Sequence, residues 1–117
     1  MKRAMAARAA RRKMETWLAM SEKIEITHVG GENAGAYRAE LPDLKEHAEL
    51  TWHRSGNDRV ADHTYTPPEM RGRGIAGKLV QAMIADAREQ GFRIVPHCPY
   101  VADWFDRHPE EADLRAE

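Results

Sequence analysis

Two consecutive prolines, Pro67 and Pro68, separate two stretches of sequence whose apolar residues recur with different periods. Before the prolines, apolar and polar residues alternate in short runs that end in turn residues, which is typical of strands. After them, apolar residues recur about every 3.6 positions, which is typical of a helix. Because proline cannot donate to a sheet ladder, the pair ends the last strand of the first stretch. The chain is therefore restricted to folds in which a run of strands precedes a helix.

Four strands are predicted before the prolines, over residues 24–29, 36–41, 48–53 and 59–66. Residue types that favour turns separate these runs, at positions 30–35, 42–44 and 55–58. Consecutive strands joined by short turns usually lie side by side in a sheet. The first stretch therefore predicts an antiparallel meander.

The stretch after the prolines predicts a helix, a strand and a second, short helix. An apolar stripe that includes Ile75 and Leu79 indicates the long helix, and Gly91 ends it as a C-terminal cap. Residues 92–95 are predicted as a strand, and the order strand, helix, strand implies a right-handed crossover to a parallel neighbour. Residues 101–108 form the last amphipathic helix. The predicted fold class is α/β (α+β): a mixed sheet with an antiparallel meander of four strands, then a helix, a parallel fifth strand and a short C-terminal helix.

The chain has 117 residues, which suits one compact domain. We assign residues 21–117 to that domain and residues 1–20 to a basic extension that is disordered or helical. The extension carries six lysines and arginines against one glutamate, whereas the remainder carries twelve against eighteen acidic residues. A basic arm can bind nucleic acid or an anionic surface, act as a targeting peptide, or have no specific role. Because the domain itself is acidic, we expect no nucleic-acid partner.

Three further features bear on where the protein works and on metals. No apolar stretch reaches the roughly 18 residues that a membrane span needs. Cys98 is the only cysteine, so it can form no internal disulfide. His53, His97 and Cys98 do not show the paired spacing of zinc ligands. We therefore expect a cytoplasmic protein that has neither a membrane partner nor a metal.

Residues 72–78, Gly-Arg-Gly-Ile-Ala-Gly-Lys, match two phosphate-binding patterns. The first, G-x-G-x-x-G, binds dinucleotides when it follows the first strand of a doubly wound sheet, but four predicted strands precede it here. The second, G-x-x-x-x-G-K, needs a following serine or threonine to hold magnesium, and Leu79 stands there instead. The surrounding sequence suits neither pattern, so we favour a third interpretation.

The third interpretation takes the longer string of residues 63–79, His-Thr-Tyr-Thr-Pro-Pro-Glu-Met-Arg-Gly-Arg-Gly-Ile-Ala-Gly-Lys-Leu, which resembles the acyl-CoA site of the GNAT acetyltransferase superfamily. The motif of that superfamily is Gln or Arg, two residues, Gly, one residue, then Gly or Ala, and Arg71, Gly74 and Ala76 fill it. Independently of the resemblance, glycines let the backbone approach an anion, and amides at a helix start attract negative charge. The alternative without a ligand is a helix start with packing glycines and solvated arginines.

The resemblance covers roughly residues 24–110 and is closest to the short single-domain branch of the superfamily, which lacks the two helices between the first and second strands. It implies that the loop holds the pyrophosphate of the cosubstrate acetyl-CoA and that the backbone of the fourth strand pairs with the pantetheine arm. Thr66 stands where the superfamily usually has valine, and the C-terminal hairpin that helps to wall the acceptor site is missing. The implied cofactor-binding residues are Tyr65, Thr66, Arg71, Gly72, Arg73, Gly74, Ile75, Ala76 and Gly77.

Acetyl transfer to an amine needs a neutral nucleophile, stabilisation of a tetrahedral oxyanion and a proton donor for the departing thiolate. Cys98 and Tyr100 follow the fifth strand, where the thioester should lie, and either could donate that proton. Cys98 could instead accept the acetyl group covalently, or it could be a small buried packing residue. His63 shares a strand face with Tyr65 and could be the base that deprotonates the acceptor, or an ordinary surface histidine.

The sequence thus predicts acetyl-CoA-dependent acetyl transfer to a primary amine of a small molecule or a protein. The alternative is a noncatalytic acyl-CoA-binding or protein-interaction module that keeps the loop without a working acceptor site. No motif selects among amines or indicates an oligomeric state.

Overall fold

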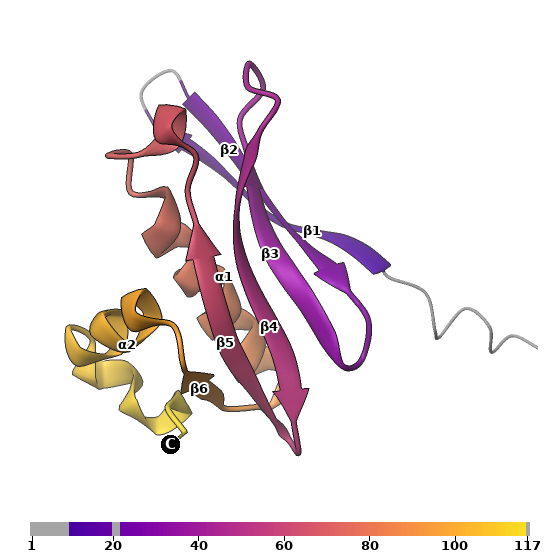
Figure 1. Ribbon diagram of the computed structural model, residues 1–117, viewed down its shortest axis with the longest axis vertical. Helices are drawn as coiled ribbons and strands as arrows, with labels where there is room; N and C mark the ends of the chain where they lie inside the picture. The colour runs from indigo at the N-terminus through magenta and orange to yellow at the C-terminus, as the bar shows by residue number, and fades with distance from the viewer. Residues whose placement is uncertain (1–9, 20–21, 117) are drawn as a thin grey trace, which may run out of the picture.

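The computed structural model describes residues 10–19 and 22–116, which form one six-stranded mixed sheet with helices packed against it (Figure 1). The strands lie across the sheet in the order of the sequence. Successive strands from the first to the fifth pair antiparallel, and the sixth is parallel to the fifth. The strands are β1 (Ala10–Ala19), β2 (Glu22–Gly30), β3 (Ala34–Glu40), β4 (His47–Ser55), β5 (Asp58–Tyr65) and β6 (Ile94–Pro96).

Four helical segments accompany the sheet within these residues: η2 (Pro68–Met70), α1 (Ile75–Gln90), α2 (Pro99–Asp106) and η3 (Pro109–Leu114), of which η2 and η3 are 3-10 helices. In Figure 1, α1 lies behind the sheet and α2 lies beside the edge that β5 and β6 form. Within the described ranges, no helix has both the length and the apolar character needed to cross a membrane.

The fold class predicted from the sequence is confirmed. β2 to β5 form the predicted meander, and Pro67 and Pro68 follow β5 directly. α1 then returns the chain to β6, which pairs in parallel with β5 over three residues, from Arg59 opposite Ile94 to Ala61 opposite Pro96. Gly91 ends α1 with a φ of 82°, the left-handed conformation that a C-terminal glycine cap adopts.

Residues 10–19 differ from the predicted disordered or helical extension, because they form β1 and pair with β2 along their whole length. The pairing register shifts between Lys13 and Glu15. Such a bulge interrupts the regular alternation along a strand, so a period of two does not run through the segment. The rest of the predicted extension, residues 1–9 and 20, lies outside the described part of the chain.

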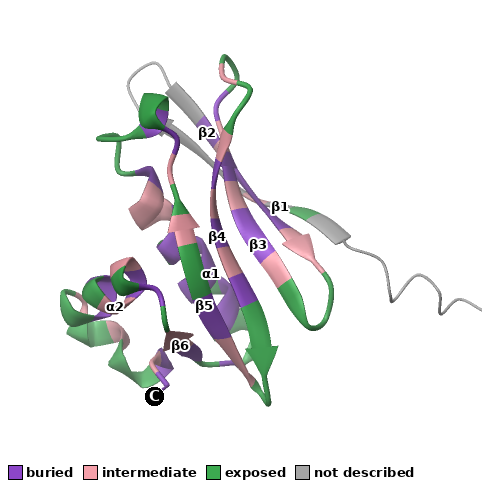
Figure 2. Ribbon diagram, viewed as in Figure 1, coloured by how far each residue is buried: buried purple, intermediate pink, exposed green. Residues whose placement is uncertain are grey.

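The core lies between the sheet and its two α-helices (Figure 2). Every second residue of β4 from Ala48 to Trp52 is buried, so this set faces α1. The largest fully buried side chains come from β2, β3, β4, β6, η2, α1 and α2, and they include Tyr37, Trp52, Leu79 and Val101.

The opposite side of the sheet carries polar residues, and no helix of the described chain lies over it in Figure 1. We call this side the open face. It carries the residues of β4 and β5 that alternate with the buried set, and the positions used below are Glu49, Thr51, His53, Asp62, His63 and Tyr65.

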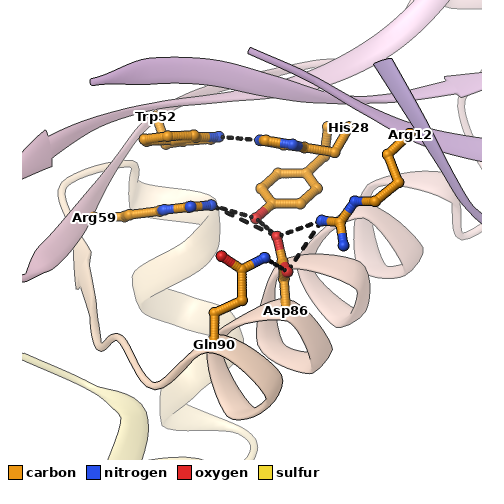
Figure 3. Close-up of polar contacts among 7 residues, drawn as sticks. Arg12, His28, Trp52, Arg59, Asp86 and Gln90 are labelled. Atoms are coloured by element: carbon orange, nitrogen blue, oxygen red, sulfur yellow. Dashed lines mark hydrogen bonds and ion pairs between the residues drawn. The ribbon is translucent and has the colours of Figure 1, made fainter. Parts of the chain in front are cut away.

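A buried carboxylate, that of Asp86 on α1, fastens the helix to the sheet (Figure 3). It accepts a hydrogen bond of 2.7 Å from the hydroxyl of Tyr37, and one guanidinium nitrogen of Arg12 lies 3.1 Å from each of its oxygens. Arg59 lies 3.6 Å away, and the amide of Gln90 donates a further hydrogen bond. Burial alone would raise the pKa of Asp86, but the hydrogen bonds from Tyr37 and Arg12 lower it below its usual value. The carboxylate is therefore charged, and the arginines offset the cost of burying it.

Aromatic rings hold Arg59 and His28 beside this carboxylate. The guanidinium of Arg59 lies 3.9 Å from the centre of the Trp52 ring and 4.1 Å from that of Phe92. The indole N–H of Trp52 donates to Nε2 of His28 at 3.0 Å, which requires that nitrogen to be unprotonated. Burial lowers the pKa of His28 from 6.5 to about 4; Asp86 opposes this shift and Arg59 adds to it. His28 is therefore neutral at pH 7.

We expect Tyr37→Phe to lower the free energy of unfolding by about 1–3 kcal/mol, because Asp86 loses a buried donor. The lost hydroxyl also accepts a hydrogen bond of 3.1 Å from Arg59. Urea denaturation measures the change. Tyr65→Phe removes a hydroxyl from a tyrosine that is 44% exposed, so it is the matched control and should stay within about 0.5 kcal/mol of the wild type. If the two substitutions lowered the free energy of unfolding equally, the stabilising role of the hydrogen bond from Tyr37 to Asp86 would be contradicted.

The shifted pKa of His28 also predicts how stability depends on pH. Between pH 6.5 and about 4 the unfolded chain protonates this histidine while the folded chain does not. Stability should therefore fall as pH falls through this window, by up to about 1.4 kcal/mol per pH unit from this group. His28→Gln should show a shallower fall in denaturation experiments at several pH values, whereas His63→Gln, on the open face, should follow the wild type. If the free energies of unfolding of His28→Gln and the wild type fell equally with pH, the lowered pKa of His28 would be refuted.

Candidate acyl-CoA site

The loop between η2 and α1 has a backbone conformation that needs glycine at two positions. Gly72 and Gly74 have φ angles of 79° and 74°, in the region where other L residues are strained. Gly74 is also the N-cap residue of α1, and no side chain in the described ranges caps this end. The first turn of α1 therefore presents backbone N–H groups without intrahelical partners, at the end of the helix where the dipole favours an anion.

A pocket of about 220 Å³ opens at this loop. Nε of Arg71 donates to the carbonyl of Thr66 at 3.0 Å and so ties the loop to the chain that leaves β5. The hydroxyl of Tyr100 reaches the start of α1, where it lies 3.6 Å from the position that a Cβ on Gly77 would take. The pocket brings together six of the nine predicted cofactor-binding residues with two others: Thr66, Met70, Arg71, Gly72, Gly74, Ile75, Ala76 and Tyr100. Tyr65, Arg73 and Gly77 do not line it.

β5 and β6 separate beyond Ala61. The last ladder pair is Ala61 with Pro96, and the N–H of Cys98 donates to the carbonyl of Ala61 at 2.9 Å. β5 then continues to Tyr65, whereas the chain after Cys98 turns away into α2 (Figure 1). In the described chain no strand pairs with residues 62–65 on the β6 side. We call the point at Ala61 and Cys98, where the two strands part, the apex.

Cys98 lies at the apex with its thiol facing the core. The residue is 5% exposed and belongs to the main hydrophobic cluster. Its sulfur lies 3.3 Å from the hydroxyl oxygen of Thr64, which is the one polar side chain of the described residues in hydrogen-bond contact with the thiol. Cys98 and Tyr100 were both predicted to lie near the thioester, but the structure places them apart. The thiol of Cys98 lies at the apex, and the hydroxyl of Tyr100 lies at the loop pocket.

His63 lies on the open face, together with Tyr65. Both are exposed, and the imidazole of His63 makes no hydrogen bond within the described chain. The preceding residue, Asp62, is an extra residue in β5, because Thr51 pairs with His63 while the next residue, Trp52, pairs with Ala61. Through this bulge Asp62 reaches His53 on β4, a contact that the sequence analysis missed.

No described cluster of three histidine, cysteine, aspartate or glutamate side chains could hold a metal ion. A larger hollow, of about 630 Å³, lies at the far end of α1 beside the Asp86 network. Its walls carry charges of both signs, from Arg12, Arg54 and Arg59 and from Glu32 and Asp58. It contains the C-terminal end of α1, where the helix dipole disfavours a phosphate, so the smaller pocket at the loop is the better anion site.

The described chain thus combines a glycine-rich helix start with two parallel strands that part beside it. The chain belongs to the GCN5-related N-acetyl-transferase family, whose model matches residues 36–114. The match runs from β3 into η3, so it includes the loop and the apex and leaves out β1 and β2. The resemblance derived from the sequence is confirmed. Membership implies acetyltransferase activity with acetyl-CoA and leaves the acceptor unidentified.

Proposed function

We propose that this protein transfers the acetyl group of acetyl-CoA to a primary amine, on a small molecule or on a protein. The observation that carries the proposal is the parting of β5 and β6 at the apex, together with the glycine-rich start of α1 at the loop. The pyrophosphate occupies the loop of residues 71–77, where glycines admit it to the backbone amides. Arg71 and Arg73 add positive charge there.

The pantetheine arm runs from the loop past Thr66 and then along the unpaired edge of β5, from Tyr65 towards Asp62. Backbone N–H and C=O groups of Tyr65 and Thr66 pair with its amides, as an added strand would. This path brings the thioester to the apex, beside Cys98. The hydroxyl of Tyr100, which lines the loop pocket, contacts the cofactor nearer the pyrophosphate.

At the apex the amine nitrogen attacks the thioester carbon, the C–N bond forms, and the C–S bond breaks. The departing thiolate then needs a proton, which Cys98 can supply from the core side with Thr64 as its hydrogen-bond partner. The attack also needs a neutral amine, so a base must remove a proton from the acceptor. His63, on the open face, is the candidate base from the sequence.

Titration calorimetry with acetyl-CoA tests the cofactor site. We expect the wild type to bind, and we expect Gly72→Ala combined with Gly74→Ala to lose at least about tenfold in affinity, because both positions have positive φ. Gly31→Ala is the matched control, since Gly31 has open space around its Cβ position and no positive φ. Wild type that binds neither acetyl-CoA nor CoA would overturn the proposed function. Binding without release of free thiol in the presence of any amine would favour the noncatalytic module.

The role of Cys98 is open to a separate test. If the thiol only donates a proton, the intact protein should gain no acetyl group when it is incubated with acetyl-CoA alone, and Cys98→Ala should bind acetyl-CoA normally while releasing thiol more slowly, by about tenfold or more. Mass spectrometry and a thiol-release assay measure the two quantities. An acetyl adduct that Cys98→Ala lacks would instead assign a covalent step to the thiol. Unchanged turnover in Cys98→Ala would reduce the residue to packing.

A further inference from the structure

The open face carries a paired imidazole and carboxylate, and the carboxylate residue, Asp62, directly follows the apex residue Ala61 in β5. Nδ1 of His53 on β4 lies 2.8 Å from Oδ1 and 3.0 Å from Oδ2 of Asp62 on β5. In the ladder His53 pairs with Val60, and the bulge places Asp62 between Ala61 and His63. Bulges often redirect side chains next to active sites. Here the bulge lets Asp62 face the same side of the sheet as His53.

The contact determines which nitrogen of the imidazole carries the proton. An ionised carboxylate only accepts hydrogen bonds, so Nδ1 of His53 must be the donor. In the neutral ring Nε2 then carries a lone pair, as it does in a histidine that a carboxylate orients for base catalysis. The His53 side chain is 51% exposed and that of Asp62 is 35% exposed, so Nε2 is open to a ligand arriving from solvent.

We propose that His53, oriented by Asp62, is the base that removes a proton from the acceptor ammonium; the inference rests on the proposed acetyl transfer and names its acceptor-side residue. Asp62 is a positioning residue in this scheme, because it acts through His53. The acceptor reaches the apex across the open face, since Cys98 and the core occupy the other side. The acceptor class is therefore a primary amine that is presented on an unhindered chain.

The two other histidines of β4 and β5 that lie on the open face suit the role less well. The imidazole of His63 has no hydrogen-bond partner in the described ranges that would fix its tautomer. His47 does have a carboxylate beside it, that of Glu49 at 3.4 Å, but it lies at the opposite end of β4 from His53. His47 pairs with Glu40 in the ladder and is remote from the apex. It is therefore the matched control for a histidine–carboxylate pair on the same strand.

The residues and substrates named above account for every proton that moves during the acetyl transfer. Nε2 of His53 takes one proton from the ammonium, and the neutral nitrogen attacks the thioester carbon. The C–N bond forms, the C–S bond breaks, and the second amine proton reaches the CoA thiolate directly or through Cys98. The imidazolium of His53 then returns its proton to solvent, which its exposure allows.

A binding experiment tests the position of His53 without requiring turnover. The side-chain resonances of the histidines are followed by NMR, first with CoA and then with a bisubstrate probe in which butylamine is joined to the CoA sulfur through the acetyl carbons. We expect the probe, beyond the effect of CoA, to shift the resonances of His53 and to leave those of His47 in place. If CoA shifts resonances of the protein but the bisubstrate probe causes no further shift at His53, the assignment of His53 is wrong and the proposed acetyl transfer is unaffected. No response to CoA at any residue would overturn the proposed function first.

Kinetics with n-butylamine and acetyl-CoA test the chemistry. His53→Gln should lower kcat by about 100-fold or more while leaving KM for acetyl-CoA unchanged. Asp62→Ala should lower kcat less, Asp62→Asn less again because its amide oxygen can still accept from Nδ1, and neither should lower it further in the His53→Gln background. His47→Gln should retain the wild-type kcat. A loss of kcat in His63→Gln with none in His53→Gln would overturn the inference and return the role to His63.

Discussion

The charged carboxylate of Asp86 is the interaction on which the arrangement of α1 depends. A carboxylate without contact to solvent is tolerated only where donors and positive charge surround it, and here they come from three strands: Arg12 from β1, Tyr37 from β3 and Arg59 from β5. The network lies near the C-terminal end of α1, and the candidate cofactor loop lies at the other end. Because a helix is stiff, fixing its last turns on the sheet also fixes the direction in which its first turn points. The loop depends in this way on residues that never touch it.

A second constraint comes from two prolines that lie on either side of Cys98. Pro96 has no N–H to extend the ladder of β6, and Pro99 occupies the first turn of α2, where the absence of an N–H costs nothing. β6 is therefore short. Its ladder with β5 ends at the pair of Ala61 and Pro96, and the chain after Pro96 leaves the sheet. β5 continues for four residues beyond its ladder with β6, from Asp62 to Tyr65, and so its edge stays open there. The gap that the proposed function assigns to pantetheine thus follows from local chain stereochemistry.

Periodicity was sufficient to predict β2 to β5 and α1, because each of these elements has a buried face, whereas β6 was predicted from a short run of β-branched residues after Gly91. It failed for β1, because the bulge between Lys13 and Glu15 breaks the alternation and the basic composition favoured an extension. The loop was predictable because glycine is the residue that positive φ requires, whereas the pair of His53 and Asp62 was not, since a bulge created by tertiary pairing joins them.

The position of Asp86 in the sequence could have been used to predict a buried polar network. It stands in the apolar stripe of α1, next to Ala87 and three residues after Met83, and both of these are buried. An acidic residue that faces the core requires hydrogen-bond donors, and the arginine and tyrosine side chains of neighbouring strands can provide them. The sequence alone could therefore have predicted that such partners exist. It could not have identified Arg12, because that residue lies in a segment whose strand was itself missed.

If the proposed function holds, the sheet itself separates the two proton transfers of the reaction. Cys98 and Thr64 lie on the core side of the apex, whereas His53 and Asp62 lie on the open face. The departing thiolate needs one proton from a donor close by, and a dry surrounding strengthens that transfer. The base must release its proton to water after every turnover, which an exposed imidazole does readily. Because no helix of the described chain lies over the open face, the acceptor side can stay exposed in this scheme, and the step that gains from exclusion of water takes place on the other side of the strand.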